Sequence, residues 1–320
     1  MLGLIRKLHA SGVVGLNERN CEYILRYNPR HLYPLVDDKL ATKRLAMAAG
    51  LPVPELYGVI GSHREVRDLP KIVASHRDFV VKPAQGSGGD GILVVSARVK
   101  ERNVYRLVDG SVLSEDDIEF HLSNIISGQY SLGGHRDVAL VEYCVKFDST
   151  FAEHAFRGVP DIRVIVFRGY PVLGMVRLPT RRSHGKANLH QGAVGAGLDF
   201  ATGRTTYGVI GNSVVTEHPD TGAAIAGLQL PQWSYLLEFS ARCYELTGLG
   251  YLGVDIVLDR DKGPMLLELN ARPGLNIQIA NRCGLRTRLA LVEQQPAGAA
   301  VEERVAFAMH ALATAAPALN

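Results

Sequence analysis

Three side chains with oxygen donors, close together in the last third of the chain, have types and spacing suited to metal chemistry. Asp255 lies in one apolar run, and Glu268 and Asn270 lie in a second run that the polar segment 259–264 separates from the first. Both runs have the length and composition of buried strands, so we expect a hairpin. Glu268 and Asn270 are two apart and share a face. Two carboxylates and an amide suit Mg²⁺, which takes its other ligands from water and phosphates. Acids that merely face water on an edge hairpin are the alternative.

A lysine followed by a glycine-rich turn is a candidate for phosphate binding. Lys82 belongs to the expected strand 79–83, the turn spans Gln85 to Gly91, and residues 92–95 form the return strand. Glycines permit positive φ and let backbone N–H groups approach a phosphate. The turn is not a P-loop, because the lysine precedes the glycines and no Gly-Lys-Ser/Thr follows. A loose hairpin tip without a ligand remains the alternative.

A single acid, Glu142, interrupts the apolar strand expected over 138–145. A carboxylate in such a strand is costly unless it has a partner. A ribose diol or an adenine edge would be one partner, and a structural arginine would be another. The sequence leaves both open.

Positive charge is concentrated in the middle of the chain. Between Arg157 and Lys186, Asp161 is the only acid among many arginines. Such a local field suits a polyanionic ligand. A triphosphate, an RNA patch and a solvated basic face all fit this pattern.

Composition sets broader limits. The chain has 320 residues, of which 47% are hydrophobic and 21% charged, enough for a large core in one or two domains. A net charge of +3 is too small to indicate nucleic-acid binding. The four cysteines form no Cys-x-x-Cys pair, which favours reduced thiols in the cytoplasm. No signal peptide and no apolar run long enough to span a membrane are apparent.

Several other elements follow from capping and turn signals. Ser114, with Asp117 three residues later, predicts a helix to about residue 127. Gly50 and Gly248 have the positions of helix-ending glycines. The expected elements are a helix over 40–49, a helix over 233–246, a hairpin of strands 161–167 and 172–178, and a long loop over 181–197.

The order of these motifs resembles the ATP-grasp superfamily, and within it the RimK-like alpha-L-glutamate ligases. The resemblance covers roughly residues 37–285 and rests on seven motifs in the family's order: the helix after Asp37-Asp38-Lys39, Lys82 with its glycine hairpin, the strand of Glu142, Asp161-Ile162-Arg163, Asn188-Leu189-His190, Val254-Asp255-Ile256, and Glu268-Leu269-Asn270 with Pro273-Gly274.

The resemblance implies an α+β protein with the ATP-grasp fold, in which two α+β subdomains grip ATP between antiparallel sheets. Family members usually carry a larger domain ahead of the grasp, so the N-terminal region is expected to be truncated. The implied parts are a short N-terminal segment (1–36), a helical lead-in (37–75), a lid subdomain (76–145), a metal-binding subdomain (146–295), and a C-terminal helix and tail (296–320).

The resemblance also assigns roles to residues. The residues expected to contact ATP are two lysines, Lys39 and Lys82, and one acid, Asp161. The glycine hairpin adds Gln85, Gly86, Ser87, Gly88, Gly89 and Gly91, and the adenine pocket adds Glu142, Tyr143, Cys144 and Val145. Two Mg²⁺ ions, with Mn²⁺ as an alternative, would be held by Asp255, Glu268 and Asn270. The catalytic set reaches toward the transferred phosphate and the carboxylate: Arg163, Lys186, Asn188 and Arg272.

The implied activity is ATP-dependent formation of an amide. ATP phosphorylates a carboxylate, and an amine, expected to be glutamate or a related amino acid, displaces phosphate from the acyl phosphate. The carboxylate acceptor is unknown, no nucleic-acid partner is expected, and an oligomer is compatible with the sequence. A phosphotransferase on the same scaffold and a non-catalytic nucleotide-binding module are the alternatives.

Overall fold

The computed structural model describes residues 10–86, 88–99 and 104–314, which fold into two compact units. Unit 1 contains the described residues up to Asp37, the segment Leu45–Pro52, and the described residues from Phe147 onward. Unit 2 contains Asp38–Arg44 and the described residues of Val53–Lys146. Within these ranges, no helix combines the length and the apolar character needed to cross a bilayer.

Unit 2 is built on a six-stranded sheet in which every neighbouring pair is antiparallel. Its order is β1-β6-β2-β3-β4-β5, so the strand that carries Lys82 lies between the strand of Glu142 and the return strand of the glycine hairpin. The strands are β1 (Leu56–Ile60), β2 (Phe79–Pro83), β3 (Leu93–Val99), β4 (Val104–Leu107), β5 (Val112–Ser114) and β6 (Ala139–Glu142).

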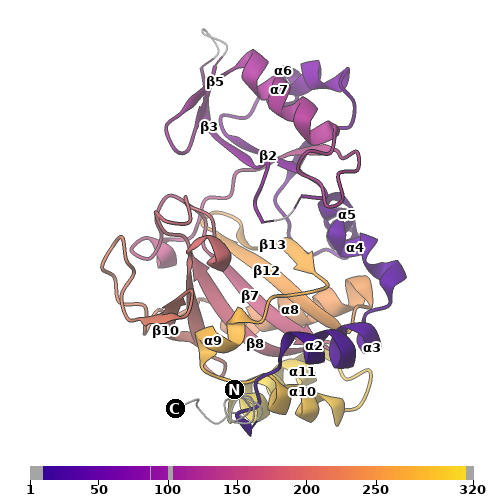
Figure 1. Cartoon of the computed structure of the whole chain (residues 1–320), viewed down its shortest axis with the longest axis vertical. Helices are drawn as coiled ribbons and strands as arrows, with labels where there is room; N and C mark the ends of the chain where they lie inside the picture. The colour runs from indigo at the N-terminus through magenta and orange to yellow at the C-terminus, as the bar shows by residue number, and fades with distance from the viewer. Residues whose placement is uncertain (1–9, 87, 100–103, 315–320) are drawn as a thin grey trace. The chain divides into compact units, whose positions relative to one another are not determined.

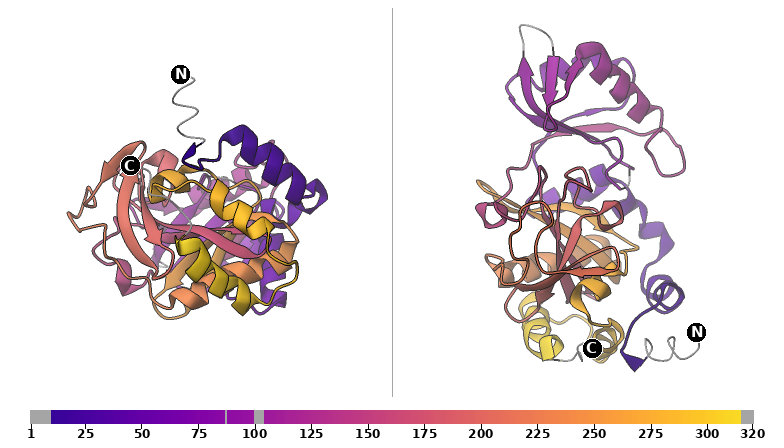
Figure 2. Two further views of the ribbon diagram at one scale, coloured as in Figure 1. Left: turned by 90° about the horizontal axis from the view of Figure 1, so that it is seen from below. Right: turned by 60° about the vertical axis from the view of Figure 1, so that its left-hand side comes forward.

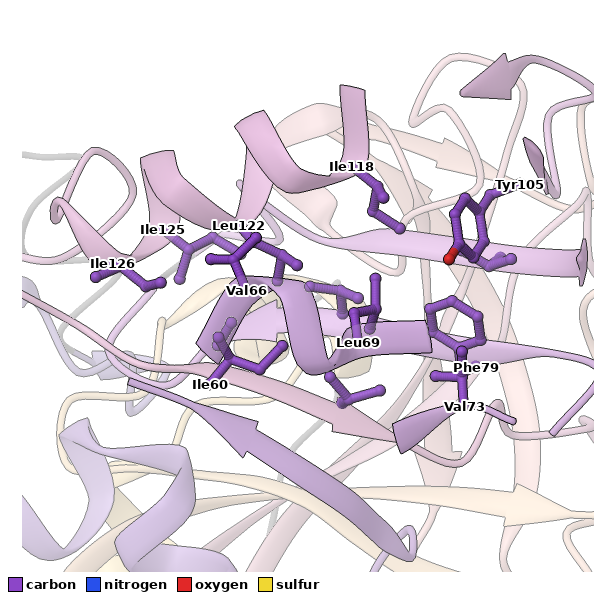
Figure 3. Packing of buried hydrophobic residues seen from close by; sticks show 14 residues of the cluster. Ile60, Val66, Leu69, Val73, Phe79, Tyr105, Ile118, Leu122, Ile125 and Ile126 are labelled. Carbon is purple, nitrogen blue, oxygen red and sulfur yellow. The ribbon is translucent and has the colours of Figure 1, made fainter. Parts of the chain in front are cut away.

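Helices cover one face of this sheet and form its core. The helix α7 (Glu115–Ile126) begins with a capping box, in which the Asp117 N–H donates to Ser114 Oγ over 3.1 Å and the Ser114 N–H donates to Asp117 Oδ2 over 2.9 Å. Its apolar stripe, including Ile118 and Leu122, packs with Phe79 of β2 in a fully buried cluster (Figure 3). The short helices η3 (Glu65–Asp68) and α6 (Leu69–Ile72) add Val66 and Leu69 to the same cluster.

Unit 1 is built on a seven-stranded antiparallel sheet with the order β11-β10-β9-β8-β7-β12-β13, whose four last strands lie side by side in Figure 1. The predicted hairpin 253–270 forms one edge of the sheet as β12 and β13. The strands are β7 (Asp161–Phe167), β8 (Tyr170–Leu178), β9 (Val194–Asp199), β10 (Arg204–Ile210), β11 (Ser213–Val215), β12 (Tyr251–Asp259) and β13 (Gly263–Asn270).

Two layers of helix pack against the unit 1 sheet. The helix α8 (Trp233–Thr247) contacts β7, β8 and β12, and α11 (Val301–Phe307), in yellow in Figure 2, contacts α8 and β8. The helix α9 (Asn276–Asn281) lies on β8, β9 and β10. Gly197 permits this approach, because a Cβ at that position would stand 2.2 Å from the Ala280 carbonyl oxygen. The other helical segments of unit 1 are α2 (Leu16–Glu18), η1 (Arg19–Ile24), α3 (Leu25–Tyr27), η2 (Arg30–Leu32), α4 (Pro34–Asp37), η5 (Ser149–Phe151), η6 (Leu189–Gln191), α10 (Arg286–Glu293) and η7 (Ala308–Leu312).

Most predicted elements are confirmed, with shifted ends. The helix expected over 40–49 is α5 (Lys39–Ala48). Its first residues, up to Arg44, belong to unit 2, and the rest belongs to unit 1. Gly50, just after the helix, has a φ of +68°. The strand expected over 138–145 is shorter, and ends at Glu142. The predicted four-residue connection between β7 and β8 was wrong. Phe167 pairs directly with Tyr170, because Arg168 and Gly169 both have positive φ and make the two-residue turn that suits the twist of a hairpin.

Candidate functional site

A row of charged side chains crosses one face of the unit 1 sheet, and the strand register decides which of them meet. Arg177 of β8 lies opposite Asp161 of β7. Arg163 of β7 lies opposite Asp255 of β12, which in turn lies opposite Glu268 of β13. Directly opposed side chains on neighbouring strands contact each other, so this register pairs each arginine with an acid.

Asp255 is fully buried at the centre of the row. Arg163 Nε donates to its Oδ1 over 2.6 Å and Arg163 Nη2 makes a second bond, while Arg177 Nη2 donates to Oδ2 over 2.7 Å. Burial alone would raise the pKa of Asp255, but the two guanidinium groups outweigh burial and hold the pKa below its ordinary value. Asp255 is therefore an ionised carboxylate whose two oxygens are both engaged by arginine.

Asp161 is also enclosed. Its two oxygens accept from Arg177, with Nη2 to Oδ2 at 2.6 Å, and its side chain is buried. Burial raises the pKa of Asp161 above its ordinary value even beside Arg177. The predicted contact between Asp161 and a nucleotide stays a prediction, and this placement does not favour it.

The outer end of the row is more open. Asn270 Nδ2 donates to Glu268 Oε1 over 3.3 Å and to Asp255 Oδ2 over 3.4 Å, so the three side chains lie together, with the amide nitrogen of Asn270 rather than its oxygen facing the carboxylates. The Glu268 side chain is 32% exposed, whereas the Asp255 side chain is fully buried. Arg163 Nη2 lies 3.8 Å from Glu268 Oε1, too far for a hydrogen bond.

This donor set fits a hard divalent cation at its open end. The Glu268 carboxylate offers oxygen donors of the type that Mg²⁺ prefers and Asn270 carries an amide oxygen, whereas the negative charge of Asp255 is balanced by Arg163 and Arg177. Over the described ranges, no three His, Cys, Asp or Glu side chains group together in a way that could hold a metal ion. The remaining ligands would therefore be water and phosphate oxygens. The assignment of these residues as metal ligands stays a prediction.

A second charged cluster lies inside unit 2. Glu142 Oε2 is 2.9 Å from Lys43 Nζ, and Glu142 Oε1 forms a short ion pair with Lys82 Nζ. All three side chains are about 95% buried. Burial lowers the pKa of Lys43. Burial alone would raise the pKa of Glu142, but the positive charges of Lys82 and Lys43 outweigh burial and hold the pKa of Glu142 below its ordinary value. Two lysines share one carboxylate, which leaves a buried surplus of positive charge.

The glycine-rich hairpin is anchored at its base by Asp137. The N–H of Gln85 donates to both oxygens of Asp137, at 3.0 and 3.2 Å, and Ser131 Oγ donates to the same carboxylate over 2.7 Å. Asp137 is buried. Lys39 Nζ donates to the carbonyl of Gly86, which brings the lysine that the resemblance assigns to phosphate against the hairpin.

The far end of the hairpin is fixed as well. The carbonyl of Gly91 accepts from His121 Nε2 over 2.9 Å, and a Cβ at Gly91 would stand 2.6 Å from the Tyr130 ring. Gly88 and Gly89 have φ of +66° and +82°, a backbone conformation that favours glycine. Ser87, which was also predicted to belong to the site, lies outside the described residues.

Other predicted site residues are placed as follows. Arg272 lies 3.4 Å from Asp37 and its guanidinium stands 5.2 Å from the centre of the Tyr33 ring. Asn188 Oδ1 accepts from the His190 N–H over 3.0 Å at the start of η6. The residues expected at the adenine pocket, Tyr143, Cys144 and Val145, follow the end of β6. The Tyr143 N–H donates to the Glu55 carbonyl over 2.8 Å. Lys186 lies in the loop before η6. Their roles stay predictions.

Three residues of these clusters were missed from sequence. Lys43 lies four residues after Lys39 and so shares a helix face with it, which was an available signal. Arg177 is a charged residue within an apolar strand, the same signal that singled out Glu142. Asp137 carries no comparable signal, since an acid just before a strand is ordinary turn chemistry.

Comparison with solved structures gives distant likenesses, among them the following three. A D-cycloserine synthetase, DcsG, is 18% identical over 87% of this chain and 80% of its own, with a TM-score of 0.47. The ATP-grasp ligase PsnB complexed with a minimal precursor is 18% identical over 84% of this chain and 63% of its own, with a TM-score of 0.47. A D-alanine–D-alanine ligase from Bacillus anthracis is 14% identical over 88% and 68%, with a TM-score of 0.44. The chain thus spans less than two thirds of the PsnB chain, and these values are too low to assign a function.

A family model gives the decisive match. No curated protein matches the chain. The model described as "Sugar-transfer associated ATP-grasp" matches residues 18–294, which confirms the predicted ATP-grasp superfamily and fold and leaves the RimK-like branch a prediction. Because the match covers most of the chain, this protein belongs to the sugar-transfer associated ATP-grasp family.

Proposed function

We propose that this protein is an ATP- and Mg²⁺-dependent carboxylate–amine ligase that forms an amide through an acyl phosphate. Glutamate or a related amino acid is the proposed amine, in keeping with the RimK-like resemblance of the sequence. A cytoplasmic location belongs to the same proposal. The family description adds sugar-linked carboxylates to the acceptors worth testing.

The observation that carries the proposal is the buried cation surplus of unit 2. Lys43 and Lys82 share the single carboxylate of Glu142. An unbalanced buried cation is costly unless an anion joins it. Lys39 contacts the glycine-rich hairpin beside β2, where backbone N–H groups are suited to phosphate. A polyphosphate would balance the surplus, and ATP is the polyphosphate that this family's name specifies.

The metal ligands that we propose in unit 1 would act in the phosphoryl-transfer step. Mg²⁺ at Glu268 and Asn270 would offset the negative charge that builds up on the phosphates. A carboxylate oxygen attacks the γ-phosphorus of ATP, the bond to ADP breaks, and the acyl phosphate that forms loses inorganic phosphate when the amine attacks its carbonyl carbon. The chain needs only to bind, orient and neutralise, since no protein nucleophile takes part.

The experiment uses hydroxylamine in place of the amine. Hydroxylamine converts an acyl phosphate to a hydroxamate, whereas a phosphate ester does not react. The protein is incubated with Mg·ATP and a panel of carboxylates, including sugar acids, and both ADP and hydroxamate are measured. The proposal predicts equal amounts of the two products with at least one carboxylate.

Two other results would point elsewhere. ADP with a phosphorylated product and no hydroxamate would favour a phosphotransferase. An unchanged melting temperature with Mg·ATP would favour neither enzyme, because a ligand that binds the folded state must stabilise it. A Glu268→Gln variant serves as the inactive control in each assay.

A further inference from the structure

We propose that Arg19 and Asn28, in the N-terminal helical segment of unit 1, are positioning residues for the predicted site residues Asn270 and Arg272. The inference rests on the proposed function, since it concerns how groups used in that function are held in place. Neither Arg19 nor Asn28 belongs to the predicted ATP, metal or catalytic sets. Both lie in the part of the chain for which the sequence predicted only a short N-terminal segment.

The chain turns back over the unit 1 sheet directly after Asn270. Asn270 is the last residue of β13 and pairs with Gly253 of β12. Pro273 then packs on the same glycine, because a Cβ at Gly253 would stand 2.7 Å from Pro273 Cβ. Ala271 and Pro273 are buried beyond the end of the strand pairing, so their carbonyl groups need partners from elsewhere in the chain.

Asn28 supplies the first of these partners and is itself buried. Its Nδ2 donates to the Tyr251 carbonyl over 2.7 Å and to the Ala271 carbonyl over 2.9 Å. Its Oδ1 accepts from the Tyr251 N–H over 2.8 Å. One carboxamide therefore joins the first residue of β12 to the residue that follows Asn270, and continues the contact of the two strands past their last backbone pair.

Arg19 supplies the second partner. Its side chain is buried, and its Nη1 donates to the Pro273 carbonyl over 2.9 Å. Its Nε and Nη2 both donate to Asn20 Oδ1, at 3.1 and 2.8 Å, which fixes the plane of the guanidinium group. The carbonyl groups that Asn28 and Arg19 hold lie on either side of Arg272, so the backbone of Arg272 is fixed from both directions.

The side chain of Arg272 contacts the same N-terminal segment. Its Nη2 donates to Asp37 Oδ2 over 3.4 Å, and its guanidinium stands 5.2 Å from the centre of the Tyr33 ring. The helix α4, which ends at Asp37, also contacts β13. One segment therefore holds both the backbone and the side chain of a predicted catalytic residue.

The segment is attached to unit 1 by other contacts as well. Arg286 donates to both carboxylate oxygens of Glu18, with Nε to Oε1 at 2.7 Å and Nη2 to Oε2 at 2.6 Å. The ring of Tyr23 stacks on the ring of Tyr251, with 6.0 Å between their centres. These contacts do not involve residues 271–274, so they give Arg19 and Asn28 fixed positions from which to hold that turn.

The test compares two asparagines that form the same hydrogen bonds in different places. Asn281 Nδ2 donates to the carbonyl groups of Gly174 and Ile277, both over 2.8 Å, and its Oδ1 accepts from the Leu198 N–H over 3.0 Å. Asn281 therefore matches Asn28 in the number and type of its bonds, but it joins α9 to β8 and β9. Asn28→Ala and Asn281→Ala are compared, and urea denaturation shows that each is folded under the assay conditions.

Binding of Mn²⁺ in the presence of AMPPNP, followed by electron paramagnetic resonance, is the first readout. Loss of a residue that orients metal ligands weakens metal binding by about tenfold or more. We therefore expect the Kd of Mn²⁺ to rise about tenfold in Asn28→Ala and to be unchanged in Asn281→Ala. Arg19→Met should also raise the Kd, and Arg19→Lys, which keeps a donor for the Pro273 carbonyl, should restore the affinity.

Hydrogen exchange of the peptide that covers residues 268–276 is the second readout, and it needs no metal. Exchange in this peptide should be faster in Asn28→Ala than in Asn281→Ala, because only the first variant releases the turn after Asn270. Equal Kd values for the two asparagine variants, or equal exchange rates, would overturn the inference. If Asn28→Ala does not fold, Arg19→Met and Arg19→Lys decide in the same two measurements.

The two readouts also separate this inference from the proposed function. A wild-type protein that binds no Mn²⁺ with AMPPNP would contradict the proposed function. Hydrogen exchange would still decide whether Asn28 fixes the turn that carries Arg272.

Discussion

Lys43 Nζ lies 2.9 Å from Glu142 Oε2 in the interior of unit 2, and neither side chain keeps more than 5% of its exposure. Glu142 also pairs with Lys82, so one carboxylate holds two buried ammonium groups. The partner of Glu142 in this structure is thus a pair of lysines, rather than the arginine that the sequence left open.

Glu142→Gln is expected to destabilise the protein strongly. The substitution would leave two buried lysines without a counter-charge, and removing one partner of a buried ion pair costs about 3–5 kcal/mol. Urea denaturation measures the free energy of unfolding. Adding Lys82→Met should recover part of the loss, because one unbalanced charge is then removed. A double variant no more stable than Glu142→Gln would count against this coupling.

Two carboxylates of the unit 1 row, Asp255 and Glu268, should respond differently to replacement by their amides. Asp255→Asn is expected to lower the free energy of unfolding by about 3 kcal/mol or more, because Arg163 and Arg177 lose their shared anion. Glu268→Gln, on a side chain with 32% exposure, should change stability little but abolish Mn²⁺ binding followed by electron paramagnetic resonance. Retention of Mn²⁺ affinity in Glu268→Gln would show that the metal assignment is wrong.

Asp137→Asn should weaken nucleotide binding from a distance. The carboxylate accepts from the Gln85 N–H and from Ser131, and so fixes the base of the glycine hairpin. Hydrogen bonds to a charged group contribute enough that we expect the Kd of Mg·AMPPNP to rise about tenfold. Asp109→Asn, at an exposed turn of the same unit, is the control. Equal affinities for the two variants would exclude a positioning role for Asp137.

His121 should make stability depend on pH. Burial lowers the pKa of His121, although its hydrogen bond to the Gly91 carbonyl opposes the shift. A lowered pKa in the folded state means that the unfolded chain binds the proton more tightly. The contribution is therefore complete above the unfolded value of 6.5 and is lost as the pH falls below it toward the lowered pKa of the folded state.

Urea denaturation between about pH 5 and pH 8 measures this contribution. The wild type should lose more stability on acidification than His121→Gln, since glutamine has no proton to gain. Parallel curves for the two proteins would contradict the assignment.

Local sequence signals recovered much of the fold. The Ser114–Asp117 capping box and the Asp255–Glu268 hairpin follow from short-range rules, and both are confirmed. The Arg168–Gly169 turn was predicted too long, because a left-handed arginine cannot be recognised from its residue type. The pairing of Arg163 with Asp255 depends on the register of strands far apart in the chain. No spacing rule supplies that register, so the arginines' commitment to acids could not be foreseen.

The central claim is that the buried lysines of unit 2 bind the phosphates of ATP, and calorimetry of Mg·AMPPNP with wild type and Lys82→Met tests it most directly. Removing Lys82 leaves Lys43 and Glu142 as a balanced pair, so the fold should survive. We predict that affinity falls about tenfold or more in Lys82→Met. Lys71→Met, at an exposed lysine of the same unit, should match the wild type. Wild-type affinity in Lys82→Met, or no binding to the wild-type protein, would contradict the account.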